Sequence, residues 1–244
     1  MRASITAAVI LAMSGSVAVA ASSATVAAIS KALADPARAD QQGDDARRKA
    51  ADVLAFSGVK PGDALVDFLP GRGYWTRIFT GIVGPRGEVV TMWPKVAAQR
   101  AEPVIAALKE KGVKAQFLVT ETNLPSTPKP VDLFWTVENY HDIANAGGEP
   151  AIAAFNKAVF ATLKHGGTYV VIDHDDTPGA GIADTSTKHR IEGAAVKAQV
   201  TTAGFQFVGE SDALRHSGDD HSKPVFDPSV RGMTDQFVYK FRKP

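Results

Sequence analysis

The glycine-bearing turn from Leu69 to Gly73 is the stretch of this sequence best suited to bind a ligand. It follows a short apolar run that contains Asp67, and its two glycines, Gly71 and Gly73, precede a segment with helical spacing. Glycine adopts positive φ and lets a backbone approach a ligand closely, and the amides that open a following helix attract a carboxylate or phosphate. A lone Gly-x-Gly is a weak signal, and the same glycines also suit a simple turn between a strand and a helix.

His141 is the side chain best suited to move a proton. An unperturbed imidazole titrates near neutral pH, so His141 can serve as a general base wherever it meets an acidic hydrogen. It follows the apolar run Val131–Val137, and a polar cluster, Asp173–Asp176, follows another run, Tyr169–Ile172. A histidine after a strand is often only a solvated or capping side chain, and that alternative stays open.

Seven apolar runs predict the strands that carry these residues. They are Ala64–Phe68, Val89–Trp93, Val113–Val119, Val131–Val137, Tyr169–Ile172, Phe205–Gly209 and Gln236–Phe241. The helices expected between and around them are one capped by Asp44 or Asp45 and ended by Gly58, Tyr74–Val83, one from Pro103 to Gly112, one with Ile152, Phe155, Val159 and Leu163 on one face, and one from about Lys188 to Gly204. This alternation predicts an α/β fold: a doubly wound, Rossmann-like, mostly parallel seven-stranded sheet with a C-terminal antiparallel strand pair.

The predicted sheet brings the polar residues together. In doubly wound sheets, ligands bind beyond the carboxyl ends of the strands. The residues at these positions are Asp67–Gly73, Trp93–Lys95, Glu121–Asn123, Glu138–His141 and Asp173–Asp176. We therefore expect a ligand-binding rim along one edge of the sheet.

Composition narrows the class of protein and of partner. The chain has 244 residues, of which 45% are hydrophobic, enough for one good core and most simply one domain. Its formal net charge is +1, and its longest basic block is Arg47–Lys49. We therefore expect no nucleic-acid partner.

The N-terminus resembles an export signal. Arg2 precedes the apolar run Ile5–Met13, and the small-x-small triplet Ala18–Ala20 predicts cleavage after Ala20. The run is too short to span a bilayer, although an uncleaved anchor is the rival interpretation. With no cysteine in the chain there is no lipid-anchor site and no disulfide. We predict a signal peptide (1–20), a polar lead-in arm (21–43) and one domain (44–244), in a periplasmic or secreted protein without a stable membrane anchor.

Several motifs resemble those of class I S-adenosylmethionine-dependent methyltransferases, and most closely a poorly characterised, often exported bacterial group of predicted methyltransferases. The first is Val66–Gly73, an acidic strand end followed by a glycine loop, here in a Pro-Gly-x-Gly-aromatic version. The others are Asn139–His141, Gly166–Gly167, Asp173–His174, His189–Arg190, Ala203–Phe205 and Thr234–Phe241. The resemblance spans roughly residues 44–244 and is more specific for the fold than for the reaction.

The resemblance implies S-adenosylmethionine as the cofactor and a small molecule as the methyl acceptor. The residues it assigns to cofactor binding are Asp67, Leu69, Pro70, Gly71, Gly73, Tyr74, Trp93, Glu138 and Asn139. For the transfer itself, the near-neutral pKa of imidazole makes His141 the candidate general base, and Asp173 and His174 could orient the acceptor. Some methyltransferases bind Mg²⁺ beside a catechol-like acceptor, so Glu138, Asp173 and His174 could instead hold a metal, which needs several converging oxygens. We assign no metal ligand from the sequence.

Two departures from the family pattern bear on cofactor binding. Leu69 stands where the loop usually has its first glycine, and Met92–Pro94 replaces the carboxylate that usually accepts both ribose hydroxyls. Each unpaired buried hydroxyl would cost about 1–3 kcal/mol. Trp93 could stack on the adenine instead, with Glu121 or Asn123 reaching the sugar.

Three functions from different classes fit the sequence. The first is an exported methyltransferase that acts on a small molecule. The second is a non-catalytic extracytoplasmic binding protein that retains the fold, which the missing ribose carboxylate favours. A nicotinamide dehydrogenase is a distant third, because the third glycine of Gly-x-Gly-x-x-Gly would fall at Thr76.

Overall fold

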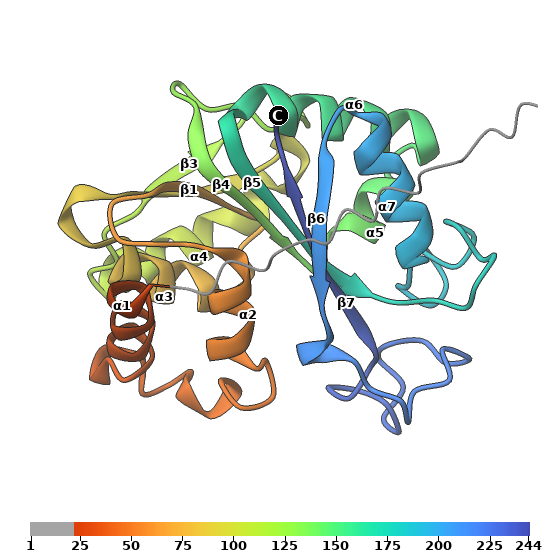
Figure 1. The fold of residues 1–244 in the computed structure, drawn as a ribbon, viewed down its shortest axis with the longest axis horizontal. Helices are drawn as coiled ribbons and strands as arrows, with labels where there is room; N and C mark the ends of the chain where they lie inside the picture. Colours follow the sequence, from red (N-terminus) through yellow and green to blue (C-terminus); the bar gives the residue numbers. More distant parts are fainter. Residues whose placement is uncertain (1–21) are drawn as a thin grey trace, which may run out of the picture.

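A sheet of seven strands forms the centre of the computed structural model, which describes residues 22–244 (Figure 1). The strands are β1 (Ala64–Phe68), β2 (Glu88–Trp93), β3 (Gln116–Val119), β4 (Val131–Val137), β5 (Leu163–His174), β6 (Gln206–Ser211) and β7 (Gln236–Arg242). Their order is β3-β2-β1-β4-β5-β7-β6; β1 to β5 are parallel, and β7 runs antiparallel to β5 and β6. The predicted fold class is confirmed, whereas the predicted signal peptide, 1–20, lies outside the described residues.

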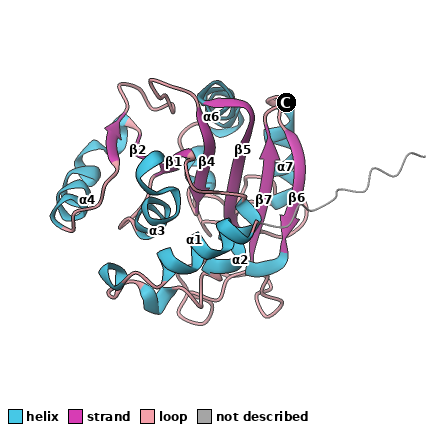
Figure 2. Cartoon of the chain, turned by 60° about the vertical axis from the view of Figure 1, so that its left-hand side comes forward, coloured by secondary structure: helices cyan, strands magenta, loops and turns pink. Residues whose placement is uncertain are grey.

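Helices cover both faces of the sheet. In the described chain they are α1 (Ser23–Leu33), α2 (Ala50–Ser57), α3 (Tyr74–Val83), α4 (Ala98–Glu110), α5 (Tyr140–Asn145), α6 (Gly148–Thr162) and α7 (Gly193–Thr202). Figures 1 and 2 show α1, α2 and α3 on one face, with α6 and α7 on the other. No helix within residues 22–244 combines the length and the apolar character needed to cross a bilayer.

The hydrophobic core has two parts because side chains alternate along each strand. On β4, Trp135 packs with the residues of α1, α2 and α3, among them Leu54 and Ile78. Its neighbour Phe134 packs with α5, α6 and α7, among them Phe155 and Val196. The sheet is therefore buried on both sides, as a parallel sheet requires.

Helix α2 begins later, and helix α4 begins earlier, than the sequence predicts. Asp45 does not cap α2, because its carboxylate pairs with Arg38, 2.7 Å away, and accepts a hydrogen bond from Tyr74, 2.6 Å away. The helix starts instead at Ala50, after Lys49 with φ of 45°. Helix α4 starts at Ala98, so that Pro103 lies inside the helix rather than at its start.

Strand β5 and helix α7 also have bounds that differ from those predicted. Gly166 and Gly167 lie within β5, which begins at Leu163 and pairs with β4 through an irregular register. Helix α7 begins at Gly193, later than predicted, because the preceding residues form an irregular segment. Arg190 in that segment binds Asp219, and Asp184 binds Lys188.

The segment expected to be a lead-in arm is folded against the domain. Ile29 and Ala32 of α1 are buried, and a Cβ on Gly81 of α3 would lie 2.9 Å from the Ala32 Cβ, so the two helices pack closely. Past α1, Asp40 pairs with buried Arg77 of α3 at 2.9 Å. The side-chain amide of Gln41 donates to the Arg72 carbonyl, 3.2 Å away, in the glycine turn. These contacts hold residues 35–48 over the edge of the sheet where β1 ends.

Candidate functional site

Two adjoining cavities lie at the edge where the parallel strands end. The first, which we call the loop cavity, has a volume of about 530 Å³ and is lined by residues 40–41, 44 and 47–48, by the turn after β1 and the start of α3, by the end of β4 and by Arg231. The second, the basic cavity, has a volume of about 550 Å³ and is lined by residues 47–49, 213–216, 225–226, 231–234 and 236, by Trp75 and by the ends of β4 and β5. The residues that line both are Arg47, Arg48, Trp75, Val137, Glu138 and Arg231. Each volume lies within the range of about 300–1,000 Å³ that is usual for ligand sites.

Most residues predicted to bind the cofactor line the loop cavity. They are Asp67, Leu69, Pro70, Gly71, Tyr74, Glu138 and Asn139. Gly73 and Trp93 are not in its lining. Gly73 has a φ of 75°, a backbone conformation that favours glycine. It also packs closely, because a Cβ there would lie 2.5 Å from the Leu108 side chain.

The turn after β1 explains why glycine is usual at its first position. Leu69 has a φ of 50°, a left-handed conformation that costs a non-glycine residue roughly 1–2 kcal/mol. The amide of Gly71 donates to the Leu69 carbonyl and that of Gly73 to the Pro70 carbonyl, at 2.8 and 2.9 Å. These two amides therefore shape the turn. A Cβ on Gly71 would meet no atom within 4 Å, so this part of the turn faces open space.

Asn139 joins the turn to the strand ends on either side. Its side-chain amide lies 3.2 Å from the Phe68 carbonyl, 3.3 Å from that of Leu69 and 2.7 Å from that of Val137. One side chain thus fixes the carboxyl ends of β1 and β4 relative to each other. Asn139, which was predicted to bind the cofactor, therefore supports the loop and also lines the cavity.

The carboxylates on the N-terminal side of the loop cavity come from the segment that was expected to be a lead-in arm and a helix cap, not part of the site. Trp93 is only 3% exposed and packs on Ala97 and Ala101, away from the cavity. Asn123, a suggested substitute, accepts a hydrogen bond from the Val96 amide and lines neither cavity. Asp40 and Asp44 line the loop cavity instead, together with Gln41, Arg47 and Arg48. The consecutive Arg47 and Arg48 were the one sequence signal that could have drawn attention to this segment.

Asp67 is buried at the floor of the loop cavity. Its side chain accepts a hydrogen bond of 2.6 Å from the Thr76 hydroxyl. Burial raises the pKa of Asp67 from 3.8 to about 7, although the hydrogen bonds from Thr76 oppose this rise. Near neutral pH, the native protein therefore holds a proton that an unfolded chain has already lost.

Asp67→Asn should change how stability depends on pH. In the parent, the unfolding free energy should fall as pH rises from about 4 to about 7, because the native state binds more protons than the unfolded state in that window. The fall due to Asp67 is of the order of a few kcal/mol, since one pKa unit corresponds to about 1.4 kcal/mol. Urea unfolding across this window should give a flatter profile for Asp67→Asn; parallel profiles for the two proteins would contradict the assignment.

The basic cavity has a strongly cationic lining. Its basic side chains are Arg47, Arg48, Lys49, Arg215 and Arg231. Arg215 pairs with Asp175 and Asp235, and Arg47 with Asp44. Within the described chain, Arg48 and Arg231 have no carboxylate partner. Arg48 stacks over the Tyr74 ring, 4.8 Å from its centre.

Glu138 stands at the junction of the two cavities. Among the described residues, it is the only carboxylate in the lining of the basic cavity, and it lines the loop cavity as well. Its φ is 57°, a conformation rare for non-glycine residues that is found often at functional sites. Its carboxylate accepts a hydrogen bond of 3.0 Å from the side-chain amide of Gln236, which holds the Glu138 side chain in place.

His141 and Asp173 form a buried pair that lines neither cavity. The ring Nδ1 of His141 lies 2.8 Å from the Asp173 carboxylate, which also accepts from the His141 and His174 amides. Burial opposes a charge on the ring, but the negative charge of Asp173 prevails and raises the pKa of His141 to about 9. At neutral pH the ring is therefore protonated and cannot accept another proton. This arrangement does not support the predicted role of His141 as general base, and Asp173 orients His141 rather than an acceptor.

His174 contributes a neutral ring to the basic cavity. Burial lowers its pKa despite the nearby carboxylates of Glu138 and Asp173. The Gln236 amide lies 3.1 Å from its Nδ1, and because an amide nitrogen only donates, the ring proton is on Nε2. Among the described residues, Glu138, Asp173 and His174 do not converge as metal ligands; the side chains that do are His141, Asp142 and His189.

Comparison with known proteins agrees with the fold. No family model matches the sequence. A ubiquinone/menaquinone biosynthesis C-methyltransferase from Ectopseudomonas mendocina is 30% identical over 127 residues, which cover 50% of this chain and 45% of that protein. The match thus spans less than half the length of that curated relative.

Solved structures resemble nearly the whole chain. An S-adenosylmethionine-dependent methyltransferase from Aquifex aeolicus superposes with a TM-score of 0.56 at 16% identity, over 90% of this chain and 98% of the other. A putative sarcosine dimethylglycine methyltransferase from Galdieria sulphuraria gives 0.59 at 14% identity, over 86% and 90%. The [4+2]-cyclase SpnF gives 0.58 at 16% identity, over 94% and 99%. With the strand order, the antiparallel β7 and the glycine turn after β1, these likenesses show that the chain has the fold of the class I S-adenosylmethionine-dependent methyltransferases.

Proposed function

We propose that this protein binds S-adenosylmethionine in the loop cavity and transfers its methyl group to a small anionic molecule in the basic cavity. The observation that carries this proposal is the pair of adjoining cavities that share Trp75 and Glu138 at the carboxyl edge of the sheet. Two reactants bound in adjoining compartments can be aligned for transfer across the shared wall.

The lining of the loop cavity suits the charges of S-adenosylmethionine. The cofactor carries a carboxylate, an ammonium group and a sulfonium, and the cavity offers both arginines and carboxylates. Arg72 is exposed beside Gly71 and can meet a carboxylate, while Asp44 can meet the ammonium group. Trp75 Nε1 is buried without a hydrogen-bond partner in the described part of the chain. A ligand oxygen in the cavity would satisfy this N–H.

The lining of the basic cavity favours a negatively charged acceptor. Arg48 and Arg231 face it without carboxylate partners among the described residues, and Lys49 and Arg215 add further positive charge. Arginine side chains bind carboxylates and phosphates through two parallel hydrogen bonds. A phenol or amine that also carries a carboxylate or phosphate would fit this chemistry.

The chain's own residues have a modest task, because bound S-adenosylmethionine supplies a methyl group that its sulfonium already activates. The basic cavity must hold the acceptor against the shared wall, and a base must remove a proton where the acceptor is a hydroxyl or amine. We assign that base to Glu138, which lines both compartments. His174 can donate a hydrogen bond from Nε2 and so help to orient the acceptor.

We extend the proposal to an exported protein. Its support is the signal-like sequence at residues 1–20.

Gly71→Leu should abolish cofactor binding while Gly62→Leu leaves it intact. Both glycines have positive φ, 54° and 89°, and a Cβ on either meets no atom within 4 Å, so the two substitutions carry a similar backbone cost. Only Gly71 lines the loop cavity, where a leucine side chain would occupy ligand space. Calorimetric titration with S-adenosylmethionine and S-adenosylhomocysteine measures the difference. Equal affinities for both variants would exclude the loop cavity as the cofactor site.

A non-catalytic binding protein is the second candidate function. The observation that favours it is buried Trp93 at the end of β2, where the related fold usually has its ribose carboxylate. A fold of this kind does not determine the reaction, and the similar structure named a cyclase illustrates this point. If the parent protein bound neither nucleotide in the titration above, this second function would replace the first.

A further inference from the structure

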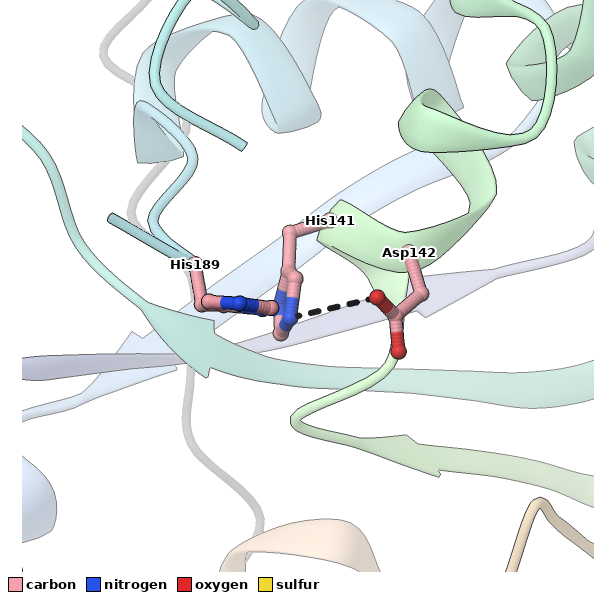
Figure 3. Close-up of side chains that lie close together, drawn as sticks. All are labelled: His141, Asp142 and His189. Carbon is pink, nitrogen blue, oxygen red and sulfur yellow. Dashed lines mark ion pairs between the residues drawn. The ribbon is translucent and has the colours of Figure 1, made fainter. Parts of the chain in front are cut away.

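Three metal-ligand side chains converge outside the two cavities. His141 and Asp142 lie in the first turn of α5, and His189 lies in the segment between β5 and α7. One ligand atom from each lies within 4.8 Å of the others. Figure 3 shows the two imidazole rings meeting edge to face, with the Asp142 carboxylate directed to the same point.

The orientation of His141 is fixed from behind by a buried carboxylate. Asp173, which is 0% exposed, lies 2.8 Å from His141 Nδ1 and so holds a proton on that nitrogen. His141 Nε2 points toward the Asp142 carboxylate, whose Oδ1 is 3.7 Å away, and a bound metal ion would displace the proton that this nitrogen carries in the metal-free protein. A carboxylate behind the imidazole is the arrangement that orients metal-binding histidines in proteins. The contact between Asp173 and His141 is an observation separate from the convergence of His141, Asp142 and His189.

Surrounding contacts hold His189 in a strained backbone conformation. Its φ of 55° is a left-handed conformation that costs a non-glycine residue about 1–3 kcal/mol and persists only when surrounding contacts enforce it. The ring packs against Phe226, 4.9 Å between ring centres. The next residue, Arg190, is anchored by its ion pair with Asp219. The ring is thereby directed at His141.

We propose that His141, Asp142 and His189 bind a divalent transition-metal ion of the zinc class. Two imidazole nitrogens and one carboxylate oxygen suit Zn²⁺ and its first-row neighbours, whereas Mg²⁺ and Ca²⁺ prefer all-oxygen sites. The side chain of Asp142 is 54% exposed, so the ion would have coordination positions open to solvent. Because Phe226 also lines the basic cavity, the ion would lie beside that compartment and join α5 to the segment before α7.

Titration with metal ions tests this site directly. The untagged full chain, stripped with a chelator, should bind one equivalent of Zn²⁺ in calorimetry and should develop visible absorption bands with Co²⁺. The chain has no cysteine, so neither signal can come from a thiolate site. Excess Mg²⁺ should not displace Zn²⁺.

Three variants make the test specific. His189→Ala and Asp142→Asn should each weaken Zn²⁺ binding more than about 100-fold, because loss of even an outer-shell partner costs about 10–100-fold. The half-exposed Asp142 can be replaced without disturbing the core, which circular dichroism will check. His165→Ala is the matched control, since His165 is exposed and its ring lies within hydrogen-bond distance of the Pro244 carbonyl. Absence of saturable Zn²⁺ binding by the parent, or unchanged affinity in both ligand variants, would overturn the proposal.

Discussion

Glu138→Gln should slow methyl transfer by roughly 10²–10⁴-fold, the range over which a general base contributes. The substitution removes the proton acceptor at the wall shared by the loop and basic cavities. It keeps the size of the side chain and an oxygen that can accept the hydrogen bond from Gln236. Affinity for S-adenosylhomocysteine should change little, so that the loss falls on kcat rather than on cofactor binding.

The assay follows labelled methyl from S-adenosylmethionine to a panel of acceptors. Phenols and amines that carry a carboxylate or phosphate should be methylated in preference to their neutral analogues, because of the cationic lining of the basic cavity. Glu149→Gln is the matched control: Glu149 pairs with Gln199 on the surface, away from both cavities. Transfer at the parent rate by Glu138→Gln would show that alignment alone suffices and that Glu138 is no base.

The centre of the fold could be predicted from the sequence because its signals are local. The apolar run of β1, the glycines of the turn and the helical spacing of α3 lie within 20 residues, and the structure gives both elements their predicted bounds. Where a cap or proline signal competed with a tertiary contact, the contact prevailed. Asp45, for example, is an ordinary helix cap in sequence but is bound by Arg38 and Tyr74 in the structure.

The rest of the site depends on contacts between distant parts of the chain. Asp40 reaches Arg77, and Gln41 reaches Arg72, so the segment expected to be an arm becomes a wall of the loop cavity. Nothing in the local sequence of that segment indicates its partner. Arg231 enters both cavities from the long connection after β6, which has no regular period.

The charge of each histidine could not be predicted from the sequence either. From sequence, the ordinary pKa of imidazole makes His141 a suitable base. The structure places its ring against buried Asp173, and this charge raises its pKa to about 9. The neighbouring His174 keeps a lowered pKa because burial is not offset by so close a carboxylate. Type and spacing identified the cluster, but only the partners of each ring decide its charge.

Arg190→Met should lower the unfolding free energy by about 3–5 kcal/mol, the cost of leaving one partner of a buried ion pair uncompensated. Arg190 is 0% exposed, and its Nη2 lies 2.9 Å from both oxygens of Asp219. It also donates to the carbonyls of Asp175 and Lys223, at 3.0 and 2.9 Å. One guanidinium therefore joins the end of β5 to the connection between β6 and β7. Since Arg215, Phe226 and Arg231 come from that connection, the basic cavity should lose its shape along with the stability.

Arg215→Met is the control for this prediction, since it makes the same substitution at an exposed position. Arg215 pairs with Asp175 and Asp235, but its side chain is 43% exposed, so its loss should cost no more than about 1 kcal/mol. Urea unfolding of the parent and both variants gives the two differences. In the double variant Arg190→Met/Asp219→Asn part of the loss should be recovered, because the buried carboxylate charge that Arg190→Met leaves behind is removed. If Arg190→Met cost no more than Arg215→Met, the pair would contribute as little as a surface ion pair, and the connection between β6 and β7 would be held by its other contacts.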